Sequence, residues 1–322
     1  MVGKVTRDDR CSASILPTLA GISPYGNANE VLQVALGIKE RNIANSEVMD
    51  MGNILEPVIA TEACKRLGID APKLDYPEAF DHPDIPISCS LDATAEGDSI
   101  EISNHIIDKG IYLMNCDSIK LEGEGIIECK NTSGLPEAEP AEWRGPLQLQ
   151  GQFLATNKKY KWGAVAVLYK GNTLRIFLYK PDEKQMNFVA DLAQDFQNRI
   201  DLYKKNEEIM WYPVETAENA AATWNEGSGE DLFLPEVEST AKEIVKLKDQ
   251  IKKSEQKLSK LQASVMEKMR DAEYATAGKY RVIWKSVNRK ETPERIIPAK
   301  PAYTYRMKTL TIKETKDESG TV

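Results

Sequence analysis

Glu128 and Lys130, two charged residues separated by one position, are the first candidates for chemistry in this sequence. Residues 126–130 have the character of a short strand, and alternate residues of a strand project from the same face. Most such pairs are surface ion pairs. Here, however, glycines precede the segment and two isoleucines begin it, which indicates a central strand. Because buried charges are costly without partners, we expect Glu128 and Lys130 to belong to a site.

Two further carboxylates could join this pair. Asp92 follows the strand-like residues 87–91, and a neighbouring strand would bring it close to Glu128. Glu56 lies near the apolar face of a helix predicted from residue 52 onward, where a carboxylate needs a cation or hydrogen-bond donors. Carboxylates on adjacent elements can share a divalent cation. The sequence therefore predicts an acidic site built from Asp92, Glu128 and Glu56.

The remaining residue types narrow the choice of metal. The chain has five cysteines without a Cys-x-x-Cys pair, and only two histidines, His82 and His105. Zinc and iron–sulfur sites usually take clustered thiolate or imidazole ligands, so we expect reduced thiols instead. Carboxylate ligands favour hard cations. The expected cofactor is Mg²⁺, for which Mn²⁺ can substitute.

Composition sets broader limits. The 322 residues include 41% hydrophobic and 29% charged residues, as expected for a globular protein, and no apolar run is long enough to span a bilayer. We therefore expect a cytoplasmic protein without a membrane partner. The net charge of −8 counts mildly against a nucleic-acid partner, although net charge does not describe how charges are distributed.

The elements that must position these residues alternate between helices and strands. Helical spacing of apolar residues covers 29–39, 52–67, 147–157 and 188–203, and residues 162–179 resemble a β-hairpin. This order predicts an α/β fold with a central mixed sheet flanked by helices. The predicted organisation is a core at 1–215 with an inserted β-excursion at 97–124, a linker at 216–235, a helical or coiled-coil segment at 236–272 and a basic β-hairpin tail at 273–322.

Two of these segments allow more than one interpretation. The 236–272 helix could pack on its own core or form a partner interface, because its apolar residues recur every three to four positions. The tail mixes basic and aromatic residues, which suits either a solvated hairpin or contact with a nucleic-acid backbone.

Taken together, the motifs resemble the YqaJ-type viral recombinase family, relatives of phage lambda exonuclease within the PD-(D/E)xK nuclease superfamily. The resemblance covers about residues 7–205. Its matching stretches are residues 13–14, 21–25, 52–57, 90–92, 128–130, the glutamine-rich helix 148–152 and the strand 162–168. It implies a PD-(D/E)xK restriction-endonuclease-like core.

The resemblance also implies a role for each acidic residue. Asp92 and Glu128 would ligate Mg²⁺ together with the main-chain carbonyl of Cys129, and Glu56 would complete the site directly or through water. Lys130 would orient or deprotonate the attacking water and offset charge at the scissile phosphate.

Further residues would handle the substrate. Gln148 would position the DNA or the attacking water. Ser14 occupies the family position that holds a terminal 5′-phosphate, with Arg7 as its expected partner and Arg10 as a competing candidate.

The implied function is Mg²⁺-dependent 5′-to-3′ digestion of double-stranded DNA ends, leaving 3′ overhangs for phage-type recombination by strand annealing. The implied partners are a single-strand annealing recombinase and further copies of the chain, typically in a trimeric ring, within the cytoplasm of a bacterial host cell. Two alternatives remain: an endonuclease of restriction or structure-specific type, and a non-catalytic DNA-binding module.

Overall fold

The computed structural model describes residues 6–40, 47–74, 78–224, 227 and 229–286. The chain divides into two compact units, Met1–Thr223 and Trp224–Val322, and each is described by itself. Among the described residues, no helix has the length and apolar character required to cross a membrane.

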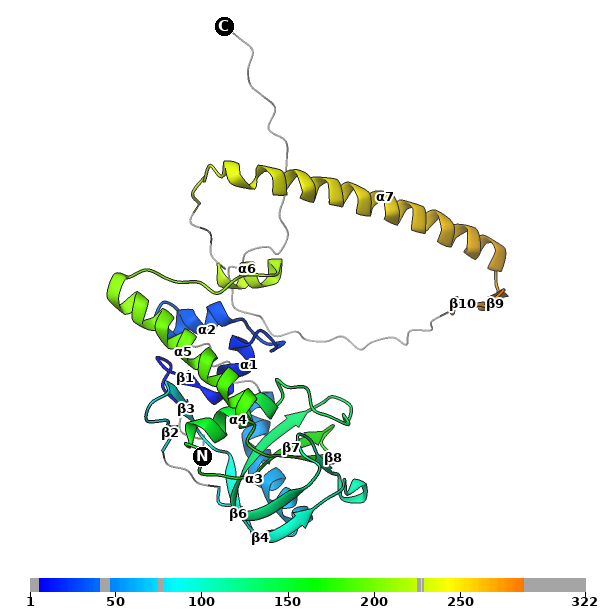
Figure 1. The fold of residues 1–322 in the computed structure, drawn as a ribbon. Coiled ribbons are helices and arrows are strands. Elements are labelled where there is room, and N and C mark those ends of the chain that lie inside the picture. The colour runs from blue at the N-terminus through cyan, green and yellow to red at the C-terminus, as the bar shows by residue number, and fades with distance from the viewer. Residues whose placement is uncertain (1–5, 41–46, 75–77, 225–226, 228, 287–322) are drawn as a thin grey trace. The chain divides into compact units, whose positions relative to one another are not determined.

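A five-stranded mixed sheet forms the centre of the first unit (Figure 1). Its order is β4-β6-β7-β8-β5, and β6 and β7 are parallel while β4/β6 and β7/β8 are antiparallel. The bounds are β4 Ala93–Ile102, β5 Ile111–Leu113, β6 Ile119–Thr132, β7 Gly163–Tyr169 and β8 Thr173–Tyr179. The predicted α/β class with a central mixed sheet is confirmed, as is the hairpin formed by β7 and β8.

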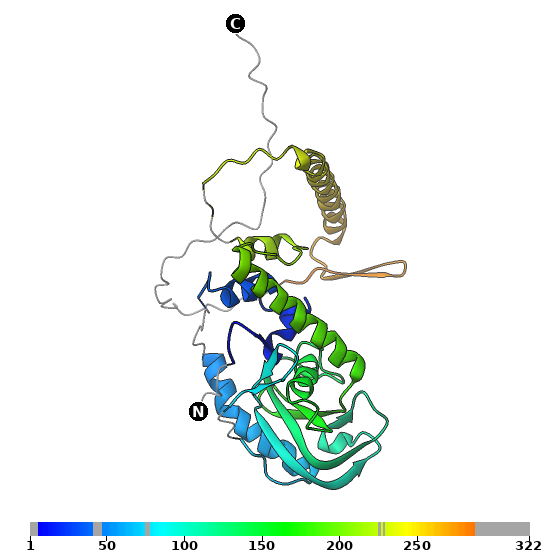
Figure 2. The ribbon, with the colours of Figure 1, turned by 60° about the vertical axis from the view of Figure 1, so that its left-hand side comes forward.

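Helices cover both faces of this sheet (Figure 2). Alternate residues of β7 point to opposite faces, so Val165 joins one apolar core and Ala164 the other. Helix α3 (Glu47–Leu67) packs on the alanine side, while α4 (Pro146–Ala155) and α5 (Glu183–Asn206) pack on the valine side. Glu128 and Val165 are register partners, so the sheet holds Glu128 at its centre.

Short elements complete the first unit. Strand β1 pairs in parallel with β3, which places the segment around Ser12 beside the strand that leads to Asp92. Helix α2 begins with a capping box in which Asn27 and Glu30 bond each other's backbone N–H groups. These elements are β1 Cys11–Ser12, η1 Ala13–Ile15, α1 Leu16–Leu19, α2 Ala28–Ala35, β2 Phe80–Asp81, β3 Ile87–Cys89, η2 Ile107–Lys109 and α6 Ala217–Thr223.

Residues 97–124 differ from the predicted inserted excursion. Strands β4 and β6 pair directly through this segment, with Gly97 opposite Gly123. Strand β5 then crosses to the far edge of the sheet and pairs with β8. The segment is therefore built into the central sheet. Local alternation predicts strands, but it does not reveal that β5 pairs with a strand about sixty residues further along the chain.

The first unit extends past the predicted boundary at residue 215. Helix α6 lies within the predicted linker 216–235 and packs near α2, where the Gln33 side-chain amide donates to the Thr223 carbonyl at 2.8 Å. The second unit contains η3 (Pro235–Val237), α7 (Glu238–Met269) and an antiparallel hairpin of β9 (Tyr274–Ala277) and β10 (Tyr280–Ile283). Residues 287–322 of the predicted tail lie outside the described residues.

Gly125 provides a test of the packing behind the site. A Cβ atom at this position would lie 2.2 Å from the indole of Trp162, which is fully buried and donates to the Gly123 carbonyl at 3.1 Å. We expect Gly125→Ala to lower the free energy of unfolding by about 1–3 kcal/mol through overpacking. Chemical denaturation measures this change.

The matched control is Gly52→Ala in α3, where a new Cβ meets open space. Alanine is the better helix former by about 1 kcal/mol, so this variant should be slightly stabilised. Equal stability of Gly125→Ala and the wild-type chain would contradict the packing argument.

Candidate active site

Asp92 lies at the turn from β3 into β4 and is held against β6. Its Oδ2 accepts a hydrogen bond from the backbone N–H of Cys129 at 2.8 Å. The next residue, Ala93, is the register partner of Ile127. The Asp92 carboxylate is therefore fixed beside the 128–130 segment of β6, as the sequence predicts.

Lys130 links the strand to helix α4. Its Nζ donates to Glu128 Oε1 at 2.5 Å and to Gln148 Oε1 at 3.0 Å. The Glu128 side chain is almost fully buried, whereas 29% of the Lys130 side chain is exposed. Lys130 is thus the charged group of this pair that solvent reaches.

Gln152 is a site residue that the sequence-based set omitted. Its Nε2 donates to Glu128 Oε2 at 2.5 Å and to the Ser90 carbonyl at 3.3 Å. Gln148 and Gln152 lie one helical turn apart and so share a face of α4. Gln150 points elsewhere: it bonds the Lys180 carbonyl and the Asp182 N–H, which anchors the connection from β8 to α5. The four-residue spacing within the glutamine-rich helix was the available signal.

The carboxylates disfavour one another's charge. Burial raises the pKa of Asp92 well above its usual range, and repulsion from Glu128 raises it further. Burial and Glu128 also raise the pKa of the half-buried Glu56, which places Glu56 within electrostatic reach of the site. For Lys130, burial lowers the pKa, but attraction to Glu128 and Asp92 outweighs this effect, so its pKa is raised. Without a bound cation, the site thus favours the protonated forms of Asp92 and Glu56.

The donor chemistry fits a hard cation. Asp92 and Glu128 supply carboxylate oxygens, and β6 supplies the Cys129 carbonyl. Burial and the two carboxylates raise the pKa of the Cys129 thiol, so its sulfur remains protonated and is a poor ligand. Within the described part of the chain, no three His, Cys, Asp or Glu side chains form a ready ligand cluster. A cation would therefore rely on main-chain oxygen and water as well as these carboxylates.

A cleft of about 420 Å³ opens beside Lys130 and Gln148. Ser14 lines the same cleft, so the structure brings this predicted phosphate ligand together with Lys130 and Gln148, whereas Glu56, Asp92 and Glu128 are not among the lining residues. Two neighbouring residues were not predicted. Arg144 stacks on the Trp143 ring at 4.7 Å and pairs with Glu137. The remaining lining residues are Pro17, Thr18, Ser23, Tyr25, Asn131 and Thr132.

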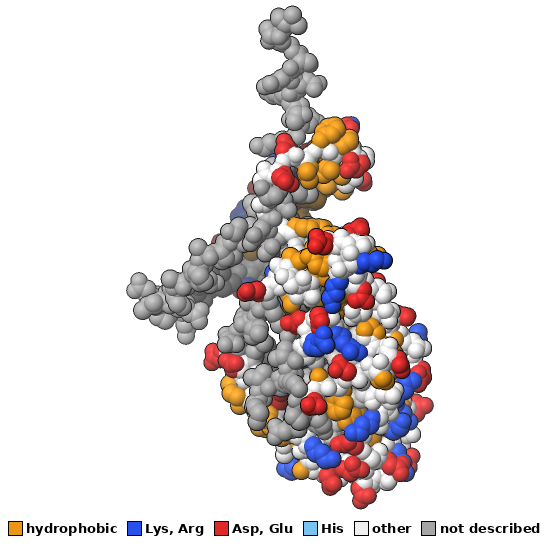
Figure 3. Space-filling view, turned by 90° about the vertical axis from the view of Figure 1, so that its left-hand side faces the viewer, with side chains coloured by type: hydrophobic (Ala, Val, Ile, Leu, Met, Phe, Trp, Pro, Cys, Tyr) orange, Lys and Arg blue, Asp and Glu red, His pale blue; other side chains and the backbone are white. Residues whose placement is uncertain are grey.

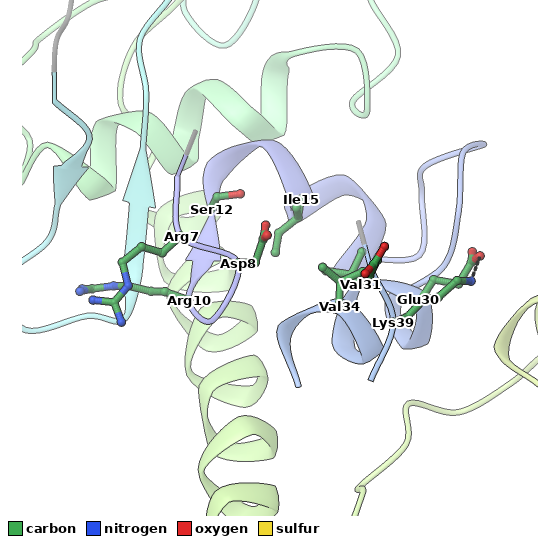
Figure 4. Close-up of a pocket in the computed structure, with 10 residues that line it drawn as sticks. Arg7, Asp8, Arg10, Ser12, Ile15, Glu30, Val31, Val34 and Lys39 are labelled. Atoms are coloured by element: carbon green, nitrogen blue, oxygen red, sulfur yellow. Dashed lines mark ion pairs between the residues drawn. The ribbon is translucent and has the colours of Figure 1, made fainter. Parts of the chain in front are cut away.

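Arg7 and Arg10 do not line this cleft. They border a separate pocket with Ser12, and Figure 4 shows their guanidinium groups projecting to the same side, away from Ile15. Arg10 donates to the carbonyls of His82 and Ile85 at 3.0 and 2.9 Å, which occupies it in holding the loop before β3. The predicted partnership of Ser14 with either arginine is therefore not formed in this structure.

Arg7 is occupied by a local contact. It forms an exposed ion pair with Asp9 at 2.7 Å. The family resemblance gave Arg7 as the partner of Ser14 and Arg10 as a competing candidate, and arginine is a typical phosphate ligand. Arg144 is far from Ser14 in the sequence. It lines the same cleft because β6 and α4 come together there.

The surface carries both signs of charge. Lysine and arginine side chains are interspersed with aspartate and glutamate on the face of the first unit drawn in Figure 3. That face is therefore not uniformly acidic, although the net charge of the chain is −8. Local basic groups such as Lys130 and Arg144 remain able to contact an anion.

No protein-family model matches the chain, and no curated protein is significantly similar to it. Among solved structures, it is similar to a crystal structure of LHK-Exo in complex with dAMP, at 14% identity and a TM-score of 0.42, covering 62% of this chain and 95% of that chain. A second structure, an alkaline exonuclease (LHK-Exo) from Laribacter hongkongensis, gives 15% identity and a TM-score of 0.41, covering 62% and 94%. At this similarity, no residue role passes from those proteins to this chain.

Proposed function

We propose that this protein is a Mg²⁺-dependent exonuclease that digests one strand of double-stranded DNA from its 5′ end. The observation that carries the proposal is the grouping of Asp92, Glu128, Lys130 and Gln148 around one stretch of β6, where Lys130 and Gln148 line a cleft. One buried and one partly buried carboxylate, beside a cationic side chain and an open cleft, suit hydrolysis of a phosphodiester.

Asp92, Glu128 and the Cys129 carbonyl would hold the cation, with Glu56 nearby. When bound, Mg²⁺ supplies charge neutralisation at the phosphate and lowers the pKa of a coordinated water. Gln152 keeps the Glu128 carboxylate in place from the α4 side through its 2.5 Å hydrogen bond. Ligand orientation therefore depends on the packing of α4 against β6.

Lys130 acts in this proposal as a cation. Its raised pKa keeps the ammonium protonated at neutral pH, so it is poorly suited to remove a proton from water. With part of its side chain exposed at the cleft, it can instead offset negative charge that develops on the phosphate. Gln148 fixes the ammonium at 3.0 Å and so positions it for this role.

The cleft provides a place for the strand end. Ser14 is exposed and can donate a hydrogen bond to a phosphate oxygen. Arg144 lines the same space, in contrast to Arg7 and Arg10, and would assist by exchanging its ion pair with Glu137 for a phosphate oxygen. The 5′ polarity, the 3′ overhang delivered to a single-strand annealing recombinase, and a ring-shaped homo-oligomer follow from the family resemblance.

Digestion of linear duplex DNA, labelled at the 5′ or the 3′ end, tests the proposal. With Mg²⁺, we expect early release of 5′ label, retention of 3′ label and no cutting of closed circular DNA. Mn²⁺ should support the same reaction, and chelation should stop it. Cleavage of circles would identify an endonuclease instead. Binding of DNA ends without cleavage in either metal would identify a non-catalytic module.

A further inference from the structure

Within the second unit taken by itself, exposed apolar side chains run in a row along α7. Leu247, Ile251, Leu258 and Leu261 are each about half exposed, at 49 to 58% of their surface. The spacing alternates between three and four residues, so these side chains share one stripe of the helix. The full stripe is Ile244, Leu247, Ile251, Ser254, Leu258, Leu261 and Val265.

The other side of α7 is charged and carries two ion pairs within the helix. Lys242 pairs with Glu238 at 2.5 Å and Lys253 with Asp249 at 2.6 Å, both one turn apart along the helix. Such pairs stabilise a solvent-exposed helix without a neighbour. The apolar stripe contributes nothing comparable while it faces water, and contiguous exposed apolar surface usually marks an interaction site.

We propose that this stripe is covered by α7 of a second copy of the chain, in a parallel two-stranded coiled coil. In heptad terms, positions a are Ile244, Ile251, Leu258 and Val265, and positions d are Leu247, Ser254 and Leu261. Mostly β-branched residues at a, with leucine at d, favour two parallel strands over three or four. Ser254 would face its counterpart at the middle of the seam.

Charges beside the seam complement this pairing. In a parallel pair, position g of one helix faces the following position e of the other. Glu243 then faces Lys248 of the second copy, and by symmetry the contact occurs twice. The next two pairs are Gln250 with Glu255 and Lys257 with Gln262. None of these three pairs sets like charges against each other.

Parallel pairing has a consequence for the hairpin that follows the helix. Both helices end at the same end of the coiled coil, so the two β9–β10 hairpins would lie close together. Each hairpin region carries Lys279, Arg281 and Lys285. The pair would present a doubled basic group to an anionic partner. This inference depends neither on the proposed nuclease activity nor on the ring-shaped homo-oligomer, because α7 lies outside residues 7–205, which carry the family resemblance.

Cysteine crosslinking of the full-length chain tests the pairing directly. Ser254→Cys and Thr240→Cys, both at d positions, should form reducible dimers at twice the 36.0 kDa chain mass under mild oxidation with diamide. Gln256→Cys, on the outer face, is the matched control. The wild-type chain sets the baseline, because four of its five cysteines are buried and only Cys116 is partly exposed.

Each outcome decides the matter. Efficient crosslinking at both d positions, with Gln256→Cys at the wild-type level, supports the parallel coiled coil. Crosslinking at Ser254→Cys alone overturns it in favour of an antiparallel pair, in which the two 240 positions would lie about 40 Å apart. No crosslinking above baseline, or equal crosslinking of all three variants, overturns the pairing of α7 with a second copy. Nuclease activity of the same preparations is measured separately, so the two proposals fail independently.

Discussion

Replacing Lys130 with alanine is expected to slow Mg²⁺-dependent digestion of linear duplex DNA by about 10²–10³-fold. The ammonium bonds Glu128 and Gln148 and is the solvent-accessible charge at the cleft wall. Its loss removes positive charge where the phosphate would be attacked. Single-turnover rates with saturating enzyme report this loss without interference from weaker DNA binding.

Two control variants separate charge from folding. Lys161→Ala removes an exposed lysine that donates to the Lys158 carbonyl, and it should retain wild-type activity. Lys130→Arg keeps the charge in a different shape, so it should retain more activity than Lys130→Ala if the role is electrostatic. Equal loss in both Lys130 variants would favour a proton-transfer role and contradict the assignment. Thermal unfolding must accompany the assay, because Lys130→Ala leaves the buried Glu128 without its cation.

The parts of the site that the sequence predicted are those that depend on local geometry. Glu128 and Lys130 share a face because a strand alternates with a period of two, and that period is visible in five residues. The position of Asp92 was predictable for a similar reason. Asp92 follows a short predicted strand, and a strand must pair with a neighbour, which brings Asp92 near Glu128. Their contacts in the structure agree with this expectation.

The parts that the sequence did not predict depend on how distant elements meet. Gln152 contacts Glu128 because of how α4 is oriented about its axis relative to β6. No local sequence pattern predicts that orientation. Arg144 reaches the cleft through the same packing, whereas Arg7 and Arg10 are turned toward another pocket by the pairing of β1 with β3. The 97–124 segment joins the sheet through a crossover to β8, a contact set by topology and not by periodicity.

Asp92→Asn is expected to have opposite effects on activity and on stability. Activity should fall by at least about 10²-fold, because the variant loses a charged oxygen ligand. The metal-free protein should become more stable at neutral pH, because asparagine removes the charge that burial and Glu128 disfavour. Its amide oxygen can still accept the Cys129 N–H, so the turn that holds residue 92 is preserved.

The pH dependence follows from the direction of the shift. Because the pKa of Asp92 is raised in the folded state, the folded wild-type protein keeps a proton that the unfolded chain has lost. The free energy of unfolding of the metal-free protein should therefore fall as pH rises above the pKa of aspartate in the unfolded chain, about 3.9. It should level off once the pH exceeds the raised pKa of Asp92 in the folded protein. Asp92→Asn has no carboxyl group at this position, so its stability does not fall in this way. The difference in Tm between Asp92→Asn and the wild-type protein should therefore grow across this pH interval.

Thermal unfolding with chelator and with Mg²⁺, at several pH values, measures both effects. Mg²⁺ should raise the Tm of the wild-type protein through binding to the folded state and should have little effect on Asp92→Asn. Asp98→Asn, at an exposed position on β4, the strand that follows Asp92, is the matched control and should follow the wild-type curve. If Asp92→Asn is less stable than wild type in chelator at every pH, Asp92 is a structural anchor. That result would contradict the proposal that Asp92 lowers the stability of the metal-free protein and is retained because it binds a cation.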